Sequence, residues 1–442
     1  MKTGMRIGMI SEHASPLATL GGADAGGQNV HVAALARRLA ADGHTVDVYT
    51  RRDDPGLPGR VPLADGVDVV HVDAGPPEPL PKDDLLRWMP TFGDDLGARL
   101  TDPGVRPDVL HAHFWMSGLA ALHATRRPGP DNEPRVPVVQ TFHALGAVKR
   151  RHQGAADTSP AERLAVERML CREADLVVAT CRDEVAELRR MGLPEDRVRV
   201  VPCGVDLGAF TPGAPAADDE AGRPLRVLSL GRLVERKGVA TAVEALARLA
   251  GRGGGPVELL VAGGPPPDRL GGDPEVLRLL NLARSLGVHD RVRFLGAVSH
   301  DEVPALLRSV DVVVCAPWYE PFGIVPLEAA ACGRPVVASA VGGMLDTVVD
   351  GRTGLLVPPR DPDAVADALA RLTDERYRLR LGAAARVRAE QRYGWASVAR
   401  QTADAYAEVV GSTAAPGPHS TYGPHGTPSV VPTPLVAAGG TP

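Results

Sequence analysis

The chain has 442 residues, which exceeds what one hydrophobic core usually supports, so we expect two domains. Its 44% hydrophobic and 23% charged residues are ordinary for a globular protein, and its net charge of -5 provides no basic excess for general nucleic-acid binding. The five scattered cysteines form no CxxC pair, which argues against a disulfide framework and a zinc site. No apolar run reaches the roughly 18 residues of a spanning helix, and the first residues predict a strand rather than a signal peptide, so we expect a cytoplasmic protein.

The first half of the chain predicts buried strands that alternate with helices. Residues 5–11 form a short apolar run, and a glycine-rich loop follows at residues 21–27. From Asn29 onward apolar residues recur at helical spacing until Gly43, and residues 45–49 form the next apolar run. This strand–helix–strand order implies a parallel sheet. Further strands are predicted at residues 67–72, 109–112, 136–141, 176–180 and 198–201.

The second half repeats the pattern after a linker rich in Pro, Gly, Ala and Asp at residues 208–224. Its strands are predicted at residues 226–229, 258–261, 292–295, 312–315, 336–339 and 354–357. We therefore expect an α/β protein with two doubly wound, Rossmann-like domains, 1–207 and 225–390, that face a cleft at the carboxyl ends of their sheets. A helix over 391–410 is expected to return to the N-terminal domain, and residues 411–442 are expected to form a disordered tail without a catalytic role.

Two clusters at predicted strand ends suit phosphate binding. The helix that begins near Gly27 offers unpaired N–H groups to an anion, although the preceding loop alone is equally typical of a turn that needs positive φ angles. Residues 231–238 follow a strand and open a helix, so Arg232 and Lys237 could bring two positive charges to a diphosphate. The alternative is a solvated basic turn, and that interpretation suits Arg236.

The third cluster, residues 320–328, has the most specific pattern. A strand ends just before it, and a helix is predicted to start near Gly323 because Pro326 is tolerated in a first turn. Glu320 therefore precedes the helix and Glu328 lies about one turn inside it, so the two carboxylates flank a helix N-terminus that can bind phosphate. A capping glutamate and a surface glutamate are the alternative, which the almost wholly apolar neighbours oppose.

Together these clusters resemble the GT4 family of retaining glycosyltransferases, over roughly residues 5–405. The similarity is greatest to the branch that contains D-inositol-3-phosphate glycosyltransferase and sucrose-phosphate synthase. The local marks of that branch are residues 26–30 (GGQNV), Lys82, residues 111–118 (HAHFWMSG) and the run 141–149. The resemblance implies the GT-B fold, in which two Rossmann-like domains face a cleft.

The resemblance also implies roles for the matching residues. Glu320 would hold a hydroxyl of the donor sugar, and His113 would lie against the transferring sugar near its anomeric carbon. Arg232 and Lys237 would stabilise the leaving diphosphate, and Glu328 would bind the ribose. The donor-binding set that the resemblance implies is Gly26, Gly27, Phe322, Gly323, Ile324, Val325, Glu328 and Arg293. His111, by contrast, is expected to pack along its strand.

The acceptor is implied to be a small phosphorylated polyol or sugar. Lys82, Thr141 and Arg163 fall where the family gathers around an acceptor phosphate, and two charged donors with a hydroxyl suit a phosphomonoester. Surface solvation is the alternative for Lys82 and Arg163. The full acceptor-binding set is Gln28, Asn29, Lys82, Thr141 and Arg163. Phe142 and Ala144 depart from both members of the branch.

No metal or other cofactor is expected, because the only Asp-x-Asp string, residues 361–363, has a proline that suits a helix first turn capped by Asp361. The resemblance favours a UDP-linked hexose or N-acetylhexosamine donor and retention of configuration. A GDP-mannose-type transferase acting on a lipid or glycan at a membrane surface, a nucleotide-sugar epimerase, a phosphorylase and a dinucleotide-dependent oxidoreductase stay open as alternatives. Either a monomer or a homodimer is expected.

Overall fold

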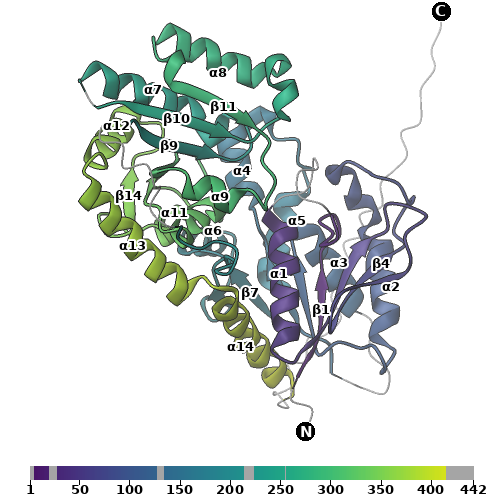
Figure 1. Cartoon of the computed structure of the whole chain (residues 1–442). Coiled ribbons are helices and arrows are strands. Elements are labelled where there is room, and N and C mark those ends of the chain that lie inside the picture. The colour runs from purple at the N-terminus through teal and green to yellow at the C-terminus, as the bar shows by residue number, and fades with distance from the viewer. Residues whose placement is uncertain (1–3, 19–26, 127–133, 214–222, 254, 415–442) are drawn as a thin grey trace, which may run out of the picture.

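Two α/β domains lie side by side, and the last helix of the chain joins them (Figure 1). The computed structural model describes residues 4–18, 27–126, 134–213, 223–253 and 255–414. The N-terminal domain has an eight-stranded sheet of order β3-β4-β2-β1-β5-β6-β7-β8, and the C-terminal domain has a six-stranded sheet of order β11-β10-β9-β12-β13-β14. The predicted pair of doubly wound, mainly parallel sheets is therefore confirmed.

The strands of the N-terminal sheet are mostly continuous apolar runs, as expected for strands that helices cover on both faces. Their bounds are β1 Arg6–Ile10, β2 Thr45–Arg51, β3 Arg60–Ala64, β4 Val67–Val72, β5 Val109–His113, β6 Val138–Thr141, β7 Leu176–Ala179 and β8 Val198–Val200. All pairs are parallel except β3 with β4. The sequence did not predict β3, an edge strand whose Pro62 cannot donate to a ladder. The Asp65-Gly66 pair between β3 and β4, with Gly66 at φ 75°, was the available hairpin signal.

Helices cover both faces of this sheet. Their bounds are α1 Gly27–Ala41, α2 Met89–Leu100, α3 Trp115–Thr125, α4 Gly146–Gln153, α5 Arg163–Glu173 and α6 Arg182–Arg190. Apolar residues of α2, α3 and α5 pack against one face, and those of α1 pack against the other. The β1–α1 and β5–α3 connections thus leave the sheet at its carboxyl edge, where the cleft is expected.

The C-terminal domain repeats the plan. Its strands are β9 Leu225–Leu230, β10 Val257–Ala262, β11 Val292–Gly296, β12 Val312–Cys315, β13 Val336–Ser339 and β14 Gly354–Val357. Its helices are α7 Val239–Gly251, α8 Pro274–Ser285, α9 Val303–Arg308, α10 Ile324–Ala331, α11 Met344–Thr347, α12 Pro362–Arg371 and α13 Glu375–Arg392. One face is covered mainly by α7, α8 and α12, and the other by α9 and α10.

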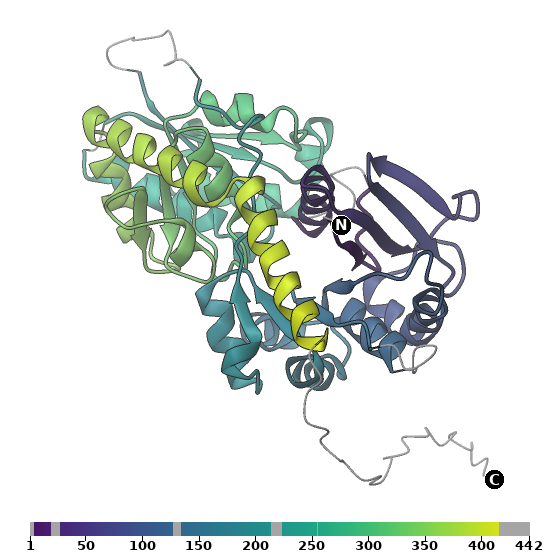
Figure 2. The ribbon, with the colours of Figure 1, turned by 90° about the horizontal axis from the view of Figure 1, so that it is seen from below.

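The chain then crosses back to the N-terminal domain. Helix α14, Trp395–Ala414, follows α13 and runs along the N-terminal domain, as the view from below shows (Figure 2). Its Val398, Tyr406 and Val409 belong to the same apolar cluster as residues of β1, β2 and α1. The expected tail from 411 onward begins with the end of this helix, and residues 415–442 lie outside the described part of the chain. None of the described helices combines the length and apolarity that crossing a bilayer requires.

Candidate active site

A cleft of about 770 Å³ separates the two domains at the carboxyl edges of their sheets. The N-terminal domain contributes residues that follow β1, β5 and β6, together with the starts of α1 and α5. The C-terminal domain contributes the ends of β9 and β12 and the loops that follow them. Because both sheets open onto this cleft, polar groups from either domain can reach a ligand bound there.

Two helix N-termini meet in the cleft. Helix α1 begins at Gly27 and helix α10 at Ile324, and both residues line the cleft. A Cβ atom on Gly27 would lie 2.9 Å from the Ile324 Cδ1, so the start of α1 packs against the Ile324 side chain. Unpaired N–H groups and the positive ends of both helix dipoles therefore converge, which is an arrangement suited to an anionic group.

Cations from the β9–α7 connection line the same part of the cleft. Lys237 forms an ion pair with Glu320, and Arg232 is exposed on the cleft wall. Gly238 makes the connection possible, because it adopts φ 71° and a Cβ there would overlap the Ala316 carbonyl oxygen. Arg236, which the sequence suggested was a solvated turn residue, also lines the cleft and has a buried Nη1 without a hydrogen-bond partner.

The Lys237–Glu320 pair keeps Glu320 ionised. Burial raises the pKa of the Glu320 carboxyl, but the charge and hydrogen bond of Lys237, the charge of Arg236 and the Phe322 N–H together hold that pKa below its usual value. A carboxylate that is anionic and partly open to the cleft can accept hydrogen bonds from sugar hydroxyls. This geometry fits the role that the resemblance implied for Glu320.

Backbone strain also concentrates around the cleft. The non-glycine residues with positive φ among those described are Phe114, His143 and Arg360. Phe114 and His143 follow β5 and β6 and line the cleft, and the Arg360 guanidinium lies 3.8 Å from the ring centroid of the cleft residue Trp318. Such conformations cost on the order of 1–3 kcal/mol each and are typical of functional sites, so they support this cleft as the active site.

Phe114 organises the N-terminal wall of the cleft. The Lys82 Nζ lies 5.3 Å and the Arg163 guanidinium carbon 5.1 Å from the centroid of its ring. Two contacts fix the position of the Arg163 guanidinium. It forms an ion pair with the buried Glu167 at 2.8 Å and donates a hydrogen bond to the Ala144 carbonyl at 2.6 Å. Two cations thus flank one aromatic ring, and both line the cleft.

Most of the residues that the sequence singled out come together here. Those that line the cleft are Gly27, Gln28, Asn29, Lys82, Arg163, Arg232, Lys237, Glu320, Phe322, Gly323, Ile324 and Val325. Gly26 lies outside the described residues. His113, Thr141, Glu328 and Arg293 are absent from the cleft wall.

His113 and Thr141 are buried and do not line the cleft, so their implied roles stay predictions. His113 is fully buried, because it lies on the same face of β5 as His111 and packs beneath the cleft floor. The residue above it is His143, whose Nε2 lies 2.9 Å from the His113 Nδ1 and whose ring also contacts Phe322. The Thr141 hydroxyl donates to the Val178 carbonyl at 3.1 Å and lies 2.9 Å from the His111 Nε2. His143, which lies in the run 141–149 that carried the resemblance, lines the cleft, as do His13 and His152.

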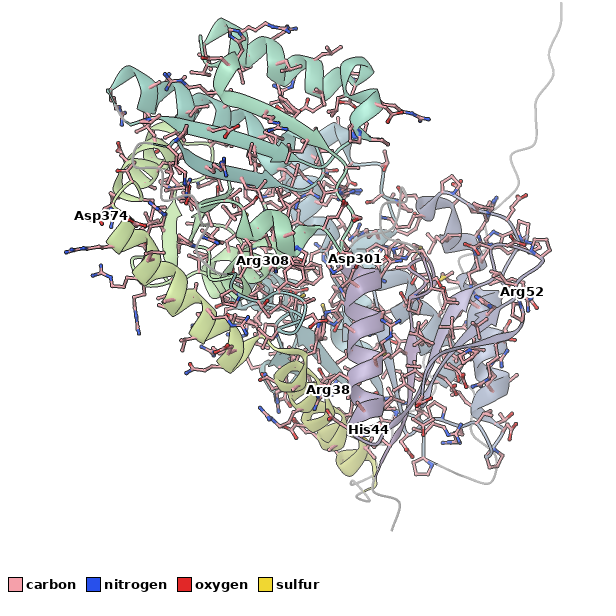
Figure 3. The ribbon with its side chains drawn as sticks, in the orientation of Figure 1. Arg38, His44, Arg52, Asp301, Arg308 and Asp374 are labelled. Atoms are coloured by element: carbon pink, nitrogen blue, oxygen red, sulfur yellow. The ribbon has the colours of Figure 1, made fainter. Side chains whose placement is uncertain are left out.

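Glu328 and Arg293 also do not line the cleft. Glu328 lines a second cavity of about 680 Å³, between α1 and the C-terminal domain, which shares Asn29 and Ile324 with the cleft. In Figure 3, Arg38, another residue of this cavity, lies toward one end of α1, and Asp301 lies near the other end of that helix. Burial raises the pKa of Glu328 to about 8. Arg293 is exposed on the edge strand β11 and lines neither cavity.

Four buried histidines contact one another at the N-terminal wall of the cleft: His31, His111, His113 and His143. Burial lowers the pKa of His31 to about 4 and, with help from the His31 charge, that of His111 to about 3. Burial and the neighbouring histidines lower the pKa values of His113 and His143 well below 6.5. The cluster is therefore neutral in the folded protein at neutral pH.

This cluster should make the fold acid-sensitive. Below pH 6.5 the unfolded chain binds protons that the folded chain does not, so stability falls as the pH falls through this range. At pH 5 the loss is about 2 kcal/mol for each of His31 and His111. Urea unfolding at pH 7 and pH 5 measures it, and His31→Phe should reduce the loss. His289→Phe, at an exposed position, should not; an equal reduction in both variants would contradict the assignment.

Among the described residues, no group of three or more His, Cys, Asp or Glu side chains could hold a metal ion. Asp361 caps α12 as predicted, because its side chain accepts a hydrogen bond from the Ala364 N–H at 2.9 Å. The expectation that the reaction needs no metal stays a prediction.

Two facing doubly wound domains with a cationic cleft between them are the arrangement of a GT-B glycosyltransferase. The profile described as "Glycosyltransferase Family 4" matches residues 25–209, and the one described as "Glycosyl transferases group 1" matches residues 215–388. The chain belongs to this family of glycosyltransferases. Its branch contains D-inositol 3-phosphate glycosyltransferases and sucrose-phosphate synthase.

One curated relative, D-inositol 3-phosphate glycosyltransferase 2 of Catenulispora acidiphila, is 38% identical over 92% of this chain and 95% of its own. Another, the D-inositol 3-phosphate glycosyltransferase of Acidothermus cellulolyticus, is 40% identical over 86% and 85%. Among solved structures, sucrose-phosphate synthase from Thermosynechococcus elongatus matches with a TM-score of 0.79 and 33% identity over 92% of this chain and all of that chain (100%). The Anabaena protein HepE in complex with UDP and glucose, at 21% identity and a TM-score of 0.66 over 91% and 100%, shares the fold.

Proposed function

We propose that the chain is a retaining glycosyltransferase that moves a hexose or N-acetylhexosamine from a nucleotide diphosphate sugar, preferentially a UDP-sugar, to a small phosphorylated polyol or sugar. One observation carries the proposal. The cleft contains two separate cationic sites on opposite walls, one at the helix N-termini with Arg232 and Lys237, the other at Phe114 with Lys82 and Arg163. One site suits the diphosphate of a donor and the other the phosphate of an acceptor.

The donor would span both cavities. Its diphosphate fits the α10 N-terminus at Gly323 and Ile324, close to Arg232 and Lys237. Because Ile324 lines both cavities, a nucleoside attached to that diphosphate can extend into the second one, where the Glu328 carboxyl is available to a ribose. On the other side of the diphosphate, the transferred sugar would lie between Glu320 and His143.

The acceptor would bind against the N-terminal wall. Charged hydrogen bonds from Lys82 and Arg163 contribute about 1.5–3 kcal/mol each, enough to select a phosphorylated acceptor over its unphosphorylated form. The names of the similar proteins, D-inositol 3-phosphate glycosyltransferase and sucrose-phosphate synthase, support a phosphorylated partner. The Ser159 hydroxyl lies beside this site, because it accepts a hydrogen bond from the Arg163 Nη1 at 3.2 Å.

In the reaction, the bond between the anomeric carbon and the diphosphate oxygen breaks, and a bond to an acceptor hydroxyl oxygen forms on the same face. The departing phosphate oxygen takes the hydroxyl proton. Arg232, Lys237 and the two helix dipoles stabilise the charge that develops on that phosphate, which is the role that a metal plays in other transferases. All five cysteines are buried free thiols, which fits a reducing compartment, and we place the protein in the cytoplasm.

The test is transfer by the purified protein in the presence of EDTA. UDP- and GDP-sugars are supplied alone, with inositol phosphate or fructose 6-phosphate, and with the unphosphorylated forms of both. We expect one donor to be consumed rapidly only when a phosphorylated acceptor is present, with the anomeric configuration retained in the product. Transfer that needs a divalent metal, or that occurs only to a lipid or glycan acceptor, would contradict the proposal.

A further inference from the structure

Glu12 and His13 follow β1 directly and form a hydrogen-bonded pair at the cleft. The His13 Nδ1 lies 2.7 Å from a Glu12 carboxylate oxygen. Glu12 is 1% exposed, whereas the His13 side chain is 10% exposed and lines the cleft. The second Glu12 oxygen accepts a hydrogen bond from the Ser117 hydroxyl, which in turn accepts one from the Glu12 N–H at 3.2 Å. The carboxylate is thus fixed behind the imidazole.

This arrangement determines which ring nitrogen a ligand meets. A carboxylate can only accept hydrogen bonds. The Nδ1 of His13 therefore carries a proton and donates a hydrogen bond to Glu12. The Nε2 is then the nitrogen left for a ligand, and it makes no hydrogen bond to a described residue. A buried acid that fixes the tautomer of an exposed imidazole is a device that positions the imidazole for a specific contact.

The position of His13 assigns that contact to the acceptor. Its ring centroid lies 4.9 Å from that of Phe114, at an interplanar angle of 62°. Lys82 and Arg163 also lie against the Phe114 ring. Three polar side chains, those of His13, Lys82 and Arg163, therefore surround this ring. Lys82 and Arg163 supply the charge that a phosphate requires. With the proton on Nδ1, the imidazole presents the lone pair of Nε2, which suits a hydroxyl group close to that phosphate.

We infer that His13 is a further acceptor-binding residue and that Glu12 is its positioning residue. The Nε2 of His13 accepts a hydrogen bond from an acceptor hydroxyl while Lys82 and Arg163 hold the acceptor phosphate. The inference rests on the proposed function and narrows its substrate class to polyol or sugar monophosphates with a free hydroxyl near the phosphate.

The experiment compares His13→Phe with His13→Gln and Glu12→Gln in the full chain, using the acceptor that the wild-type protein accepts. Leaving a substrate hydroxyl without its partner costs about 1–3 kcal/mol, so His13→Phe should lower kcat/KM for the acceptor roughly tenfold to hundredfold. The KM for the donor and the slow hydrolysis of the donor without acceptor should not change. His13→Gln should recover part of the loss, because its amide oxygen can accept a hydrogen bond near the position of Nε2.

Two controls separate this role from a structural one. If Glu12 acts through His13, the double variant Glu12→Gln/His13→Phe should be no worse than His13→Phe alone, whereas independent effects would add. Inorganic phosphate, used as a competitive inhibitor against the acceptor, should inhibit His13→Phe as well as it inhibits the wild type. It should inhibit Lys82→Met less, because Lys82 binds the phosphate itself.

The outcomes are distinguishable. A His13→Phe variant whose kcat/KM for the acceptor stays within about twofold of wild type overturns the inference, as does additive behaviour of the Glu12 and His13 substitutions. Loss of phosphate inhibition in His13→Phe would show that His13 binds the phosphate and overturns the hydroxyl assignment. A wild-type protein that transfers to no phosphorylated polyol or sugar overturns the proposed function and this inference together.

Discussion

Glu320→Ala is expected to lower the turnover of glycosyl transfer by at least about 10²–10³-fold while the protein remains folded. The carboxylate lines the cleft and can accept hydrogen bonds from a donor-sugar hydroxyl, and it also pairs with Lys237. The alanine variant lacks both the hydrogen bond to the sugar hydroxyl and the ion pair that positions Lys237 at the reacting centre. The fold should tolerate the change, because Lys237 is 26% exposed and can be solvated from the cleft.

Steady-state kinetics with saturating acceptor, combined with thermal unfolding, measure this effect. Glu258→Ala is the matched control, since Glu258 pairs with Arg226 at 3.8 Å near the opposite, amino end of the same sheet. That variant should retain wild-type turnover. Turnover of Glu320→Ala within about tenfold of wild type would refute the assignment of Glu320, and loss of the folded state would require Glu320→Gln in its place.

The strands and the donor side of the cleft were predictable because their signals are local. Strands of parallel sheets are short apolar runs, and every strand predicted from such a run is present. The phosphate-binding features at Gly27 and Ile324 follow from helix starts after a strand, which glycine and proline mark in the sequence. The position of Glu320 beside Lys237 then follows from the order of β9 and β12, which are neighbours in the sheet.

The N-terminal wall of the cleft was harder to predict because it depends on strained backbone. His111 and His113 share a face of β5, so the alternation of strand side chains buries both. The chain then reverses at Phe114 with φ 86°, and the conformation of His143 at φ 60° places the second imidazole at the cleft. Non-glycine residues rarely adopt such angles, so the place of His143 at the cleft required the structure.

Glu328 shows a second limit of prediction from sequence. Its position on α10 was predicted, but the groups that surround its side chain were not. The side chain is 7% exposed, lines the second cavity and makes no hydrogen bond or ion pair with any described residue. Burial raises its pKa to about 8 from the usual value of 4.5. At neutral pH the folded protein without ligand therefore holds this carboxyl mainly in its neutral form.

Glu328→Gln is expected to stabilise the protein, increasingly so at higher pH. Between pH 4.5 and 8 the folded state retains a proton on Glu328 that the unfolded chain has lost, so the stability of the wild type falls as the pH rises through this window. Glutamine has a similar shape and no charge, and it avoids this loss. The gain should be small near pH 4.5 and reach the order of 4 kcal/mol at pH 8. Urea unfolding at pH 5, 6.5 and 8 measures the difference between variant and wild type.

Glu195→Gln is the control, because the Glu195 side chain is 83% exposed and its substitution should leave the pH dependence unchanged. A stability difference for Glu328→Gln that does not grow with pH would contradict the account of its burial. If Glu328 binds the ribose of the donor, the same variant should also bind nucleotide more weakly, since an amide is a poorer acceptor for two ribose hydroxyls than a carboxylate is. A buried carboxyl without a partner among the described residues destabilises the ligand-free fold, and its presence is explained if the ribose hydroxyls supply those partners.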